Sequence, residues 1–113
     1  MKTITLYTKP IPVNQRTMIV RGHQTSSKKW KDTKYALAIE TRSQVNFSPL
    51  TGTLAINLLF YFGDNRKRDI DAYIKIVLDS MEGIVYENDS QVAELHCFKI
   101  IDKENPRTVI EIK

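Results

Sequence analysis

The chain has 113 residues, 42% of them hydrophobic and 27% charged, which suits one soluble globular domain spanning residues 1–113 with a single core. It contains no apolar run of the roughly 20 residues that a membrane helix needs, no signal-peptide pattern at the N-terminus, and Cys97 as its only cysteine, so we expect a cytoplasmic protein without a membrane partner or an intrachain disulfide. The formal net charge of +4 makes a polyanion a reasonable partner, although many small basic domains bind none.

Two short strands and a loop are predicted at the N-terminus. Alternating residues predict an edge strand over Thr3–Thr8, which ends before Pro10. The apolar run Met18–Val20 predicts a second strand. The polar stretch Arg21–Lys29 then predicts a mobile loop.

A helix and a central strand are predicted next. Apolar residues recur at helical spacing over Lys31–Arg42, with Asp32 or Thr33 as the capping residue. The segment Leu54–Phe62 is too apolar for a surface strand, because nearly every residue in it is hydrophobic. It predicts a strand at the centre of the sheet.

The C-terminal half predicts a second helix and two more strands. The helix runs over about Asp71–Glu82 and ends at Gly83, which suits a C-terminal cap. Strands are predicted over Gln91–Ile101 and Thr108–Lys113, and the turn-rich connection between them predicts an antiparallel hairpin. The order ββαβαββ predicts an α/β (α+β) fold, with a mixed sheet packed against two main helices.

The segment before the second helix carries a dense group of charges. Asp69 and Asp71 stand beside three cations and are followed by Lys75; the cations are Arg66, Lys67 and Arg68. Hard carboxylate oxygens bind Mg²⁺, and the metal offsets their repulsion of a phosphate backbone. The pattern therefore favours a metal-dependent nuclease.

The same carboxylates also have a purely structural interpretation. Asp71 is placed to cap the second helix, and Asp69 is placed to pair with a neighbouring arginine, Arg66 or Arg68. Lys75 lies four residues after Asp71. It either forms a simple salt bridge with Asp71 or uses its positive charge to stabilise the phosphoryl oxygens of a substrate. Spacing does not choose between these interpretations.

Asp89 is the third candidate carboxylate. It follows a turn signal, so it either forms an Asx-turn with Ser90 or joins a metal site. A helix of about 12 residues is roughly 18 Å long. The return segment Gly83–Asn88 is long enough, if extended, to retrace that length, so the geometry allows a three-carboxylate site without requiring it.

Clustered cations predict the nucleic-acid contacts. Six of the 17 Lys and Arg residues lie in two short clusters, Lys28, Lys29 and Lys31 in one and Arg66, Lys67 and Arg68 in the other. Asn14 and Arg16, in the loop before the second strand, complete the predicted DNA-binding set. Alternatively, both clusters are solvated loop charges. Trp30, between the lysines, either stacks on a base or packs in the core.

The stretch from Arg68 to Val92 resembles the signature of the RusA family of Holliday junction resolvases, which phages and prophages often carry. The pattern reads approximately D-x-D-N, a lysine, D-x-L, an apolar segment with a turn, and D-D-x-Q-[VI]; the matching residues are Asp69, Asp71, Lys75, Asp79, Asp89 and Gln91. The segment Pro10–Asn14 is similar to a further family element near the N-terminus. Ala72 and Asn88 depart from the pattern, standing where the family has an asparagine and an aspartate.

The resemblance implies a function and a set of roles. Asp69, Asp71 and Asp89 would hold Mg²⁺, with Mn²⁺ as an alternative, and would position a water for attack on a DNA phosphodiester, while Lys75 would support the transition state. The protein would act as a homodimer on four-way junction DNA, making paired symmetric nicks during recombination and repair. Because of the two departures, a catalytically inactive junction- or nucleic-acid-binding module of the same fold is the alternative.

Overall fold

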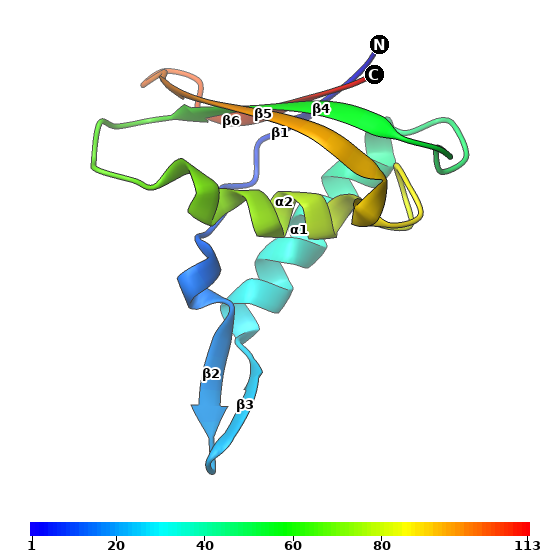
Figure 1. The fold of residues 1–113 in the computed structure, drawn as a ribbon. Helices are drawn as coiled ribbons and strands as arrows, with labels where there is room; N and C mark the ends of the chain where they lie inside the picture. The colour runs from blue at the N-terminus through cyan, green and yellow to red at the C-terminus, as the bar shows by residue number, and fades with distance from the viewer.

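The computed structural model describes residues 1–113 and consists of a four-stranded sheet with two α-helices on one face, from which a two-stranded arm extends (Figure 1). The strands and helices are β1 (Lys2–Leu6), β2 (Thr17–Val20), β3 (His23–Ser26), α1 (Lys28–Gln44), β4 (Leu54–Phe62), α2 (Ile74–Met81), β5 (Val92–Ile101) and β6 (Arg107–Ile112). Short 3₁₀ turns are η1 (Val13–Gln15), η2 (Ile70–Tyr73) and η3 (Asp89–Gln91). The predicted α+β class with a mixed sheet is confirmed.

β4 lies inside the sheet, as its apolar sequence predicts. The strand order is β1-β6-β4-β5, with β4 antiparallel to β6 and parallel to β5. Alternate residues of β4, from Leu54 to Phe62, are buried against the helices, whereas the residues between them are only half-buried. The parallel pairing requires a crossover, which η2, α2 and η3 provide.

The predicted hairpin between the last two strands is wrong. β5 and β6 lie on opposite sides of β4, so that Leu58 pairs with Cys97 on one side and with Ile110 on the other. The turn-rich connection passes across the end of β4, where the Asp102 N–H donates to the Phe62 carbonyl at 2.8 Å. The most apolar strand occupies one of the two interior positions of the sheet, because there its backbone and both flanks are covered.

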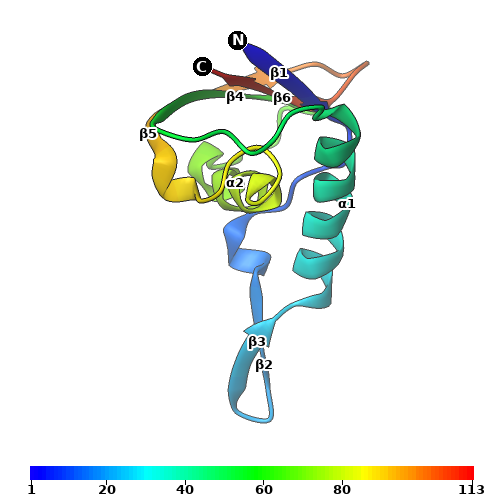
Figure 2. The same cartoon turned by 90° about the vertical axis from the view of Figure 1, so that its right-hand side faces the viewer.

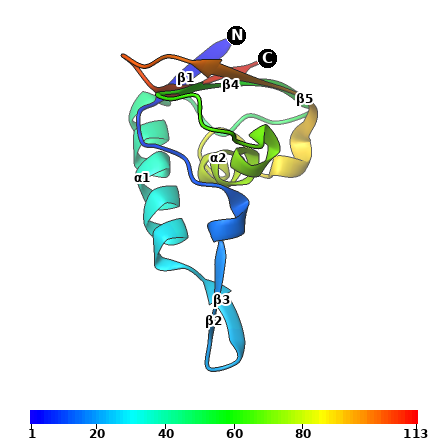
Figure 3. The ribbon, with the colours of Figure 1, turned by 90° about the vertical axis from the view of Figure 1, so that its left-hand side faces the viewer.

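The segment predicted as a mobile loop instead forms ordered structure. It contains β3, which pairs with β2 in an arm that stands away from the body (Figure 3). Arg21 and Gly22 join the two strands with φ angles of 52° and 79°, the left-handed pair that a tight two-residue hairpin requires. The arm is exposed along both strands. The protein therefore has one strand more than the predicted order ββαβαββ.

The first helix begins earlier than predicted because a different residue caps it. The Ser27 hydroxyl accepts a hydrogen bond from the Trp30 N–H at 3.0 Å, so neither Asp32 nor Thr33 is the cap. Trp30 is 2% exposed and belongs to the core, which decides its role in favour of packing. Lys28 and its neighbours consequently lie on the first turn of α1.

The C-terminal half of α1 lies beside β1 (Figure 2), and two of its side chains bond to the backbone along the free edge of β1 and of the residues that follow it. The Glu40 carboxylate accepts from the N–H groups of Tyr7 and Thr8, both at 2.7 Å. One turn along, Gln44 accepts from the Thr5 N–H at 2.9 Å and donates to the Thr5 carbonyl at 2.7 Å. These bonds replace a missing neighbouring strand. Neither helix is long and apolar enough to cross a membrane.

Candidate active site

Asp69 and Asp71 lie at a 3₁₀ turn that precedes α2. The α-helix starts only at Ile74, and Tyr73 occupies its capping position, so the predicted capping role of Asp71 is wrong. The turn is closed by backbone, with the Ala72 N–H donating to the Asp69 carbonyl at 3.1 Å. Both carboxylates are exposed, and neither takes part in any hydrogen bond or ion pair of the structure. Their oxygens are therefore free for a ligand.

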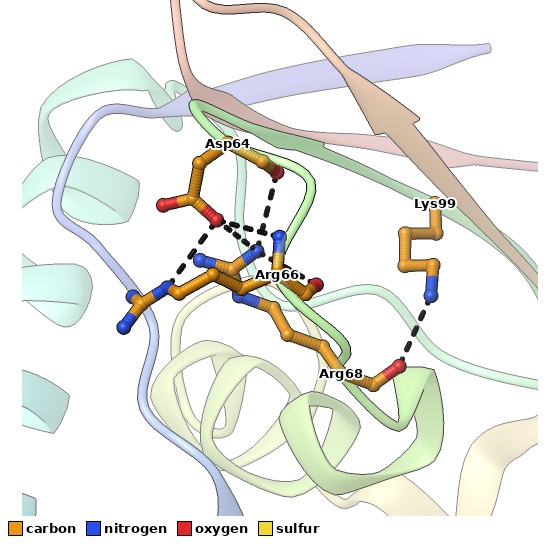
Figure 4. Close-up of polar contacts among 4 residues, drawn as sticks. All are labelled: Asp64, Arg66, Arg68 and Lys99. Carbon is orange, nitrogen blue, oxygen red and sulfur yellow. Dashed lines mark hydrogen bonds and ion pairs between the residues drawn. The ribbon is translucent and has the colours of Figure 1, made fainter.

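The arginines before Asp69 pair with another carboxylate, which overturns the predicted structural pairing of Asp69 with Arg66 or Arg68 (Figure 4). Asp64 Oδ1 lies 2.9 Å from Arg68 Nη1 and 3.3 Å from Arg66 Nε. The hydrogen bond from Arg68 is the largest reason why the pKa of Asp64 lies well below its usual range. Asp64 thus offsets one of the three positive charges in this turn and leaves it basic.

Arg68 is buried within this turn. Its side chain is 6% exposed, and its guanidinium carbon lies 4.4 Å from the centre of the Phe62 ring. From β5, Lys99 Nζ donates to the Arg68 carbonyl at 3.1 Å, at the peptide group that leads into Asp69 (Figure 4). The packed Arg68 side chain and the hydrogen bond from Lys99 therefore both fix the peptide group that precedes Asp69.

Lys75 lies between two carboxylates of the candidate site. Its Nζ is 3.0 Å from Asp79 Oδ1 and 3.8 Å from Asp89 Oδ2. The predicted salt bridge of Lys75 with Asp71 is not formed; Asp79, one turn further along α2, takes that place. The contact with Asp89 is made by the long Lys75 side chain alone. The Asp89 N–H bonds to Glu82, just beyond the last residue of α2, so Asp89 lies at the C-terminal end of this helix and its predicted return to the start of α2 is not observed.

Asn88, not Asp89, forms the Asx-turn at η3. The Asn88 side-chain oxygen accepts from the Ser90 N–H at 2.8 Å, and the Gln91 amide oxygen accepts from the Asn88 N–H at 3.1 Å. The Asp89 N–H donates to Glu82 Oε1 at 2.9 Å. The turn alternative for Asp89 is therefore wrong. An amide oxygen at Asn88 makes the hydrogen bond that an aspartate oxygen would also make there.

Tyr86 and Glu82 are further members of this site, and sequence reasoning missed both. Tyr86 is buried, and its hydroxyl donates to the Leu78 carbonyl at 2.7 Å. Burial, with smaller contributions from the charges of Asp89, Glu82 and Asp79, raises the pKa of Tyr86 above its usual range. Tyr86 is thus a neutral, packed wall behind the acidic side chains. An aromatic residue in an otherwise apolar run carries no signal of that position.

The donor types at the site fit a hard divalent cation. Carboxylate oxygens are the ligands that Mg²⁺ prefers, and Asp69 and Asp71 have no competing partner. In this structure no three Asp, Glu, His or Cys side chains gather closely enough to hold a metal ion. Asp89 faces the Lys75 ammonium instead. The assignment of Asp69, Asp71 and Asp89 as metal ligands therefore remains a prediction.

A basic groove of about 570 Å³ runs beside the turn that leads to Asp69. It is lined by Pro10, Pro12 and η1 on one side and by the cationic turn on the other, with α1 behind them. No carboxylate lines it, and its five cations are Lys9, Lys29, Arg66, Lys67 and Arg68. Four of these belong to the predicted DNA-binding set; Lys9 was missed, since it stands apart from both clusters.

The other predicted DNA-binding residues lie outside the groove lining. Asn14 is in η1 and Arg16 follows it, both exposed. Lys28 pairs with Asp32 at 2.7 Å on the solvent side of α1. Lys31 lines a separate groove, between α1 and the acidic end of α2. The structure thus brings the two sequence clusters together through Lys29 and the turn, and not through every member.

An exposed carboxylate pair, a nearby lysine and a basic groove without acidic lining are the features expected of an enzyme that acts on nucleic acid. Comparison with known proteins identifies the family of this chain. The family model described as endodeoxyribonuclease RusA matches residues 8–113, so the chain belongs to the RusA family of endodeoxyribonucleases, as the motif resemblance predicted. It is 29% identical over 119 residues to the crossover junction endodeoxyribonuclease RusA of Aquifex aeolicus (strain VF5), covering 100% of this chain and 93% of that protein.

Proposed function

We propose that this protein is a Mg²⁺-dependent endonuclease that binds four-way junction DNA and resolves it by paired symmetric nicks. The observation that carries the proposal is the pair of unpartnered carboxylates, Asp69 and Asp71, beside a basic groove in a chain of the RusA family. The name of the Aquifex relative, a crossover junction endodeoxyribonuclease, supports the junction as substrate. Recombination and repair in the cytoplasm, in a phage or a host genome, are the setting that this activity implies.

Each residue of the site has a task in the proposed reaction. Asp69, Asp71 and Asp89 would hold the cation, and Mn²⁺ has the same ligand preference. Bound Mg²⁺ supplies positive charge for the phosphoryl oxygens and lowers the pKa of a coordinated water. Lys75 offers its ammonium to the charge that develops on the phosphoryl group during attack.

The groove would hold the DNA backbone next to these groups. Lys29 and Lys67 present exposed cations without an ion-pair partner, and Arg66 adds a third, exposed beside Asp64; such cations bind phosphates without reading sequence. Two cuts on opposite strands of a junction require two active sites, and this chain carries one. A homodimer with a two-fold axis supplies both.

Cleavage of a synthetic four-way junction tests the proposal. With Mg²⁺ or Mn²⁺ the purified protein should convert the junction into two nicked duplexes, and EDTA should stop the reaction. Asp71→Asn should slow single-turnover cleavage at least about 100-fold while junction binding persists, because it removes charge from the site but not from the groove. Asp32→Asn makes the same chemical change on α1, away from these carboxylates, and should cut normally.

Equal cleavage by the wild type and Asp71→Asn would overturn the proposed site. The inactive binding module predicts another pattern: a band shift on junction DNA and no product at any concentration of either metal. Salt does not separate the two functions, since both depend on phosphate contacts.

A further inference from the structure

We infer that Asp79 is a positioning residue that holds the Lys75 ammonium beside Asp89, an inference that rests on the proposed function. Asp79 Oδ1 lies 3.0 Å from Lys75 Nζ, whereas the nearest Asp89 oxygen lies 3.8 Å away. The side chain of Asp79 is 15% exposed and that of Asp89 is 35% exposed. The closer and better buried carboxylate therefore determines where the ammonium sits.

Helix stability does not explain this pair. Lys75 is the second residue of α2 and Asp79 lies two residues before its last residue, Met81. A cation in the first turn and a carboxylate in the last turn oppose the helix dipole, and a lysine placed four residues before an acid is the weaker order for a helical salt bridge. The order of the two charges is thus unfavourable for the helix itself. The reason for the pair therefore lies outside the helix, at Asp89, which the Lys75 ammonium also contacts.

Lys75 needs a holder because its side chain is long and flexible. A lysine has four rotatable bonds, so a single contact at 3.8 Å leaves the ammonium free to move into solvent. If Asp89 held a divalent cation, Asp79 would be the remaining carboxylate within ion-pair distance of Lys75. Asp79 then keeps the ammonium at the site without itself touching the DNA.

The first experiment uses metal-free protein and does not depend on activity. Lysines are ¹³C-methylated reductively, which preserves their charge, and the Lys75 signal is identified by its absence in Lys75→Arg. In the wild type the chemical shift and line width of this signal should be those of an ammonium with restricted motion. In Asp79→Asn they should become those of a solvated surface lysine. An unchanged Lys75 signal would overturn the inference.

The second experiment is a double-mutant cycle in Mg²⁺-dependent junction cleavage. Asp79→Asn should lower the single-turnover rate about 10- to 100-fold with little change in junction affinity. The double variant Asp79→Asn with Lys75→Met should be no slower than Lys75→Met alone, because Asp79 acts through Lys75. Asp32→Asn breaks the equivalent Lys28–Asp32 pair on α1, at 2.7 Å, and should retain the wild-type rate.

Two results would contradict a positioning role: wild-type cleavage by Asp79→Asn, or a double variant slowed by the product of the two single effects. If Asp79→Asn does not fold, Asp79→Glu replaces it; this variant keeps the charge, so a folded Asp79→Glu as slow as Lys75→Met also overturns the inference. A wild type that binds but never cuts would defeat the proposed function, while the lysine signal would still decide the role of Asp79.

Discussion

Adjacent residues of the basic turn have different physical roles. Lys67 is exposed and has no partner, so its charge is available to a polyanion. Arg68 has its guanidinium paired with Asp64 and stacked on Phe62, with 6% of the side chain exposed. Both were predicted to bind DNA on the same ground, their place in one cluster. Exposure separates them: Lys67 is suited to contact phosphate, and Arg68 to hold the turn.

Alanine substitutions should show this difference. Lys67→Ala should leave the free energy of unfolding unchanged and reduce the slope of log K for junction binding against log salt by about 0.9, because one phosphate contact is lost. Arg68→Ala should lower the free energy of unfolding by about 1–2 kcal/mol, since a buried stack and a partly exposed ion pair are lost together. Denaturant titration and salt-dependent binding measure the two effects. The opposite assignment of effects would contradict these roles.

Sequence reasoning selected the candidate active-site residues but did not predict their partners. Asp69, Asp71, Lys75 and Asp89 follow from the motif, and the last two do meet in the structure. That Asp64 takes both arginines was not predictable, because it depends on how the turn folds back on Phe62. Local spacing offered Asp71 as the partner of Lys75, but Asp71 lies in the 3₁₀ turn before α2, so Asp79, four residues further along the helix, pairs with Lys75 instead.

At the scale of elements, periodicity identified strands without identifying their neighbours. β4 was predicted with its observed bounds, since an apolar nine-residue run leaves little choice. The relation of β5 to β6 was wrong because adjacency in sequence was taken for adjacency in the sheet. The start of α1 depended on the hydroxyl of Ser27, a cap that lies before the apolar pattern begins. Such short-range polar bonds set element boundaries that hydrophobic spacing does not mark.

The link between α1 and β1 has a pH-dependent component at Glu40. Burial alone would raise the pKa of Glu40, but hydrogen bonds from Thr8 and Tyr7 outweigh it and the pKa lies below its ordinary value of 4.5. Because the folded pKa is depressed, the carboxylate contributes stability fully above pH 4.5 and loses it as the pH falls through the folded pKa. Acid should therefore loosen the β1 edge.

Glu40→Gln tests this contribution. At neutral pH the variant should be less stable than the wild type by about 1–2 kcal/mol, because two charge-assisted hydrogen bonds to backbone become neutral ones. The difference should shrink as the pH is lowered below 4, where the wild-type carboxylate also becomes neutral. Urea denaturation at several pH values measures it, with Glu104→Gln in an exposed turn as the control. A difference independent of pH would refute the account.

At the scale of the whole molecule, the sheet is covered unequally. Both helices lie on one face, and α1 also closes the edge of β1 (Figure 2). The other edge is β5, a ten-residue strand whose outer side has no neighbouring strand. Along it Leu95, Phe98 and Ile101 are 37%, 48% and 45% exposed. A long apolar edge of this kind is an aggregation hazard unless something pairs with it.

A second copy of the chain is the partner that the proposed paired nicking requires, so we expect the homodimer to form along β5. By strand register Leu95 and Ile101 point to the helical side of the sheet and Phe98 to the open side. Apolar groups on both sides of a free edge suit a strand that continues the sheet across a two-fold axis. The active sites at the starts of the two α2 helices would then face the same junction from symmetric positions.

Light scattering after gel filtration should give about twice the 13.1 kDa of one chain. Phe98→Glu should convert the protein to a monomer and abolish paired nicking, because a charge on the apolar edge opposes its burial between two copies. Ile19→Glu is the matched control, since Ile19 is 76% exposed on the arm and undergoes the same change. A dimer that survives Phe98→Glu but not Ile19→Glu would move the interface to the arm. A wild-type monomer at all concentrations would remove the basis for paired cutting, because one chain then brings one active site to a substrate that needs two.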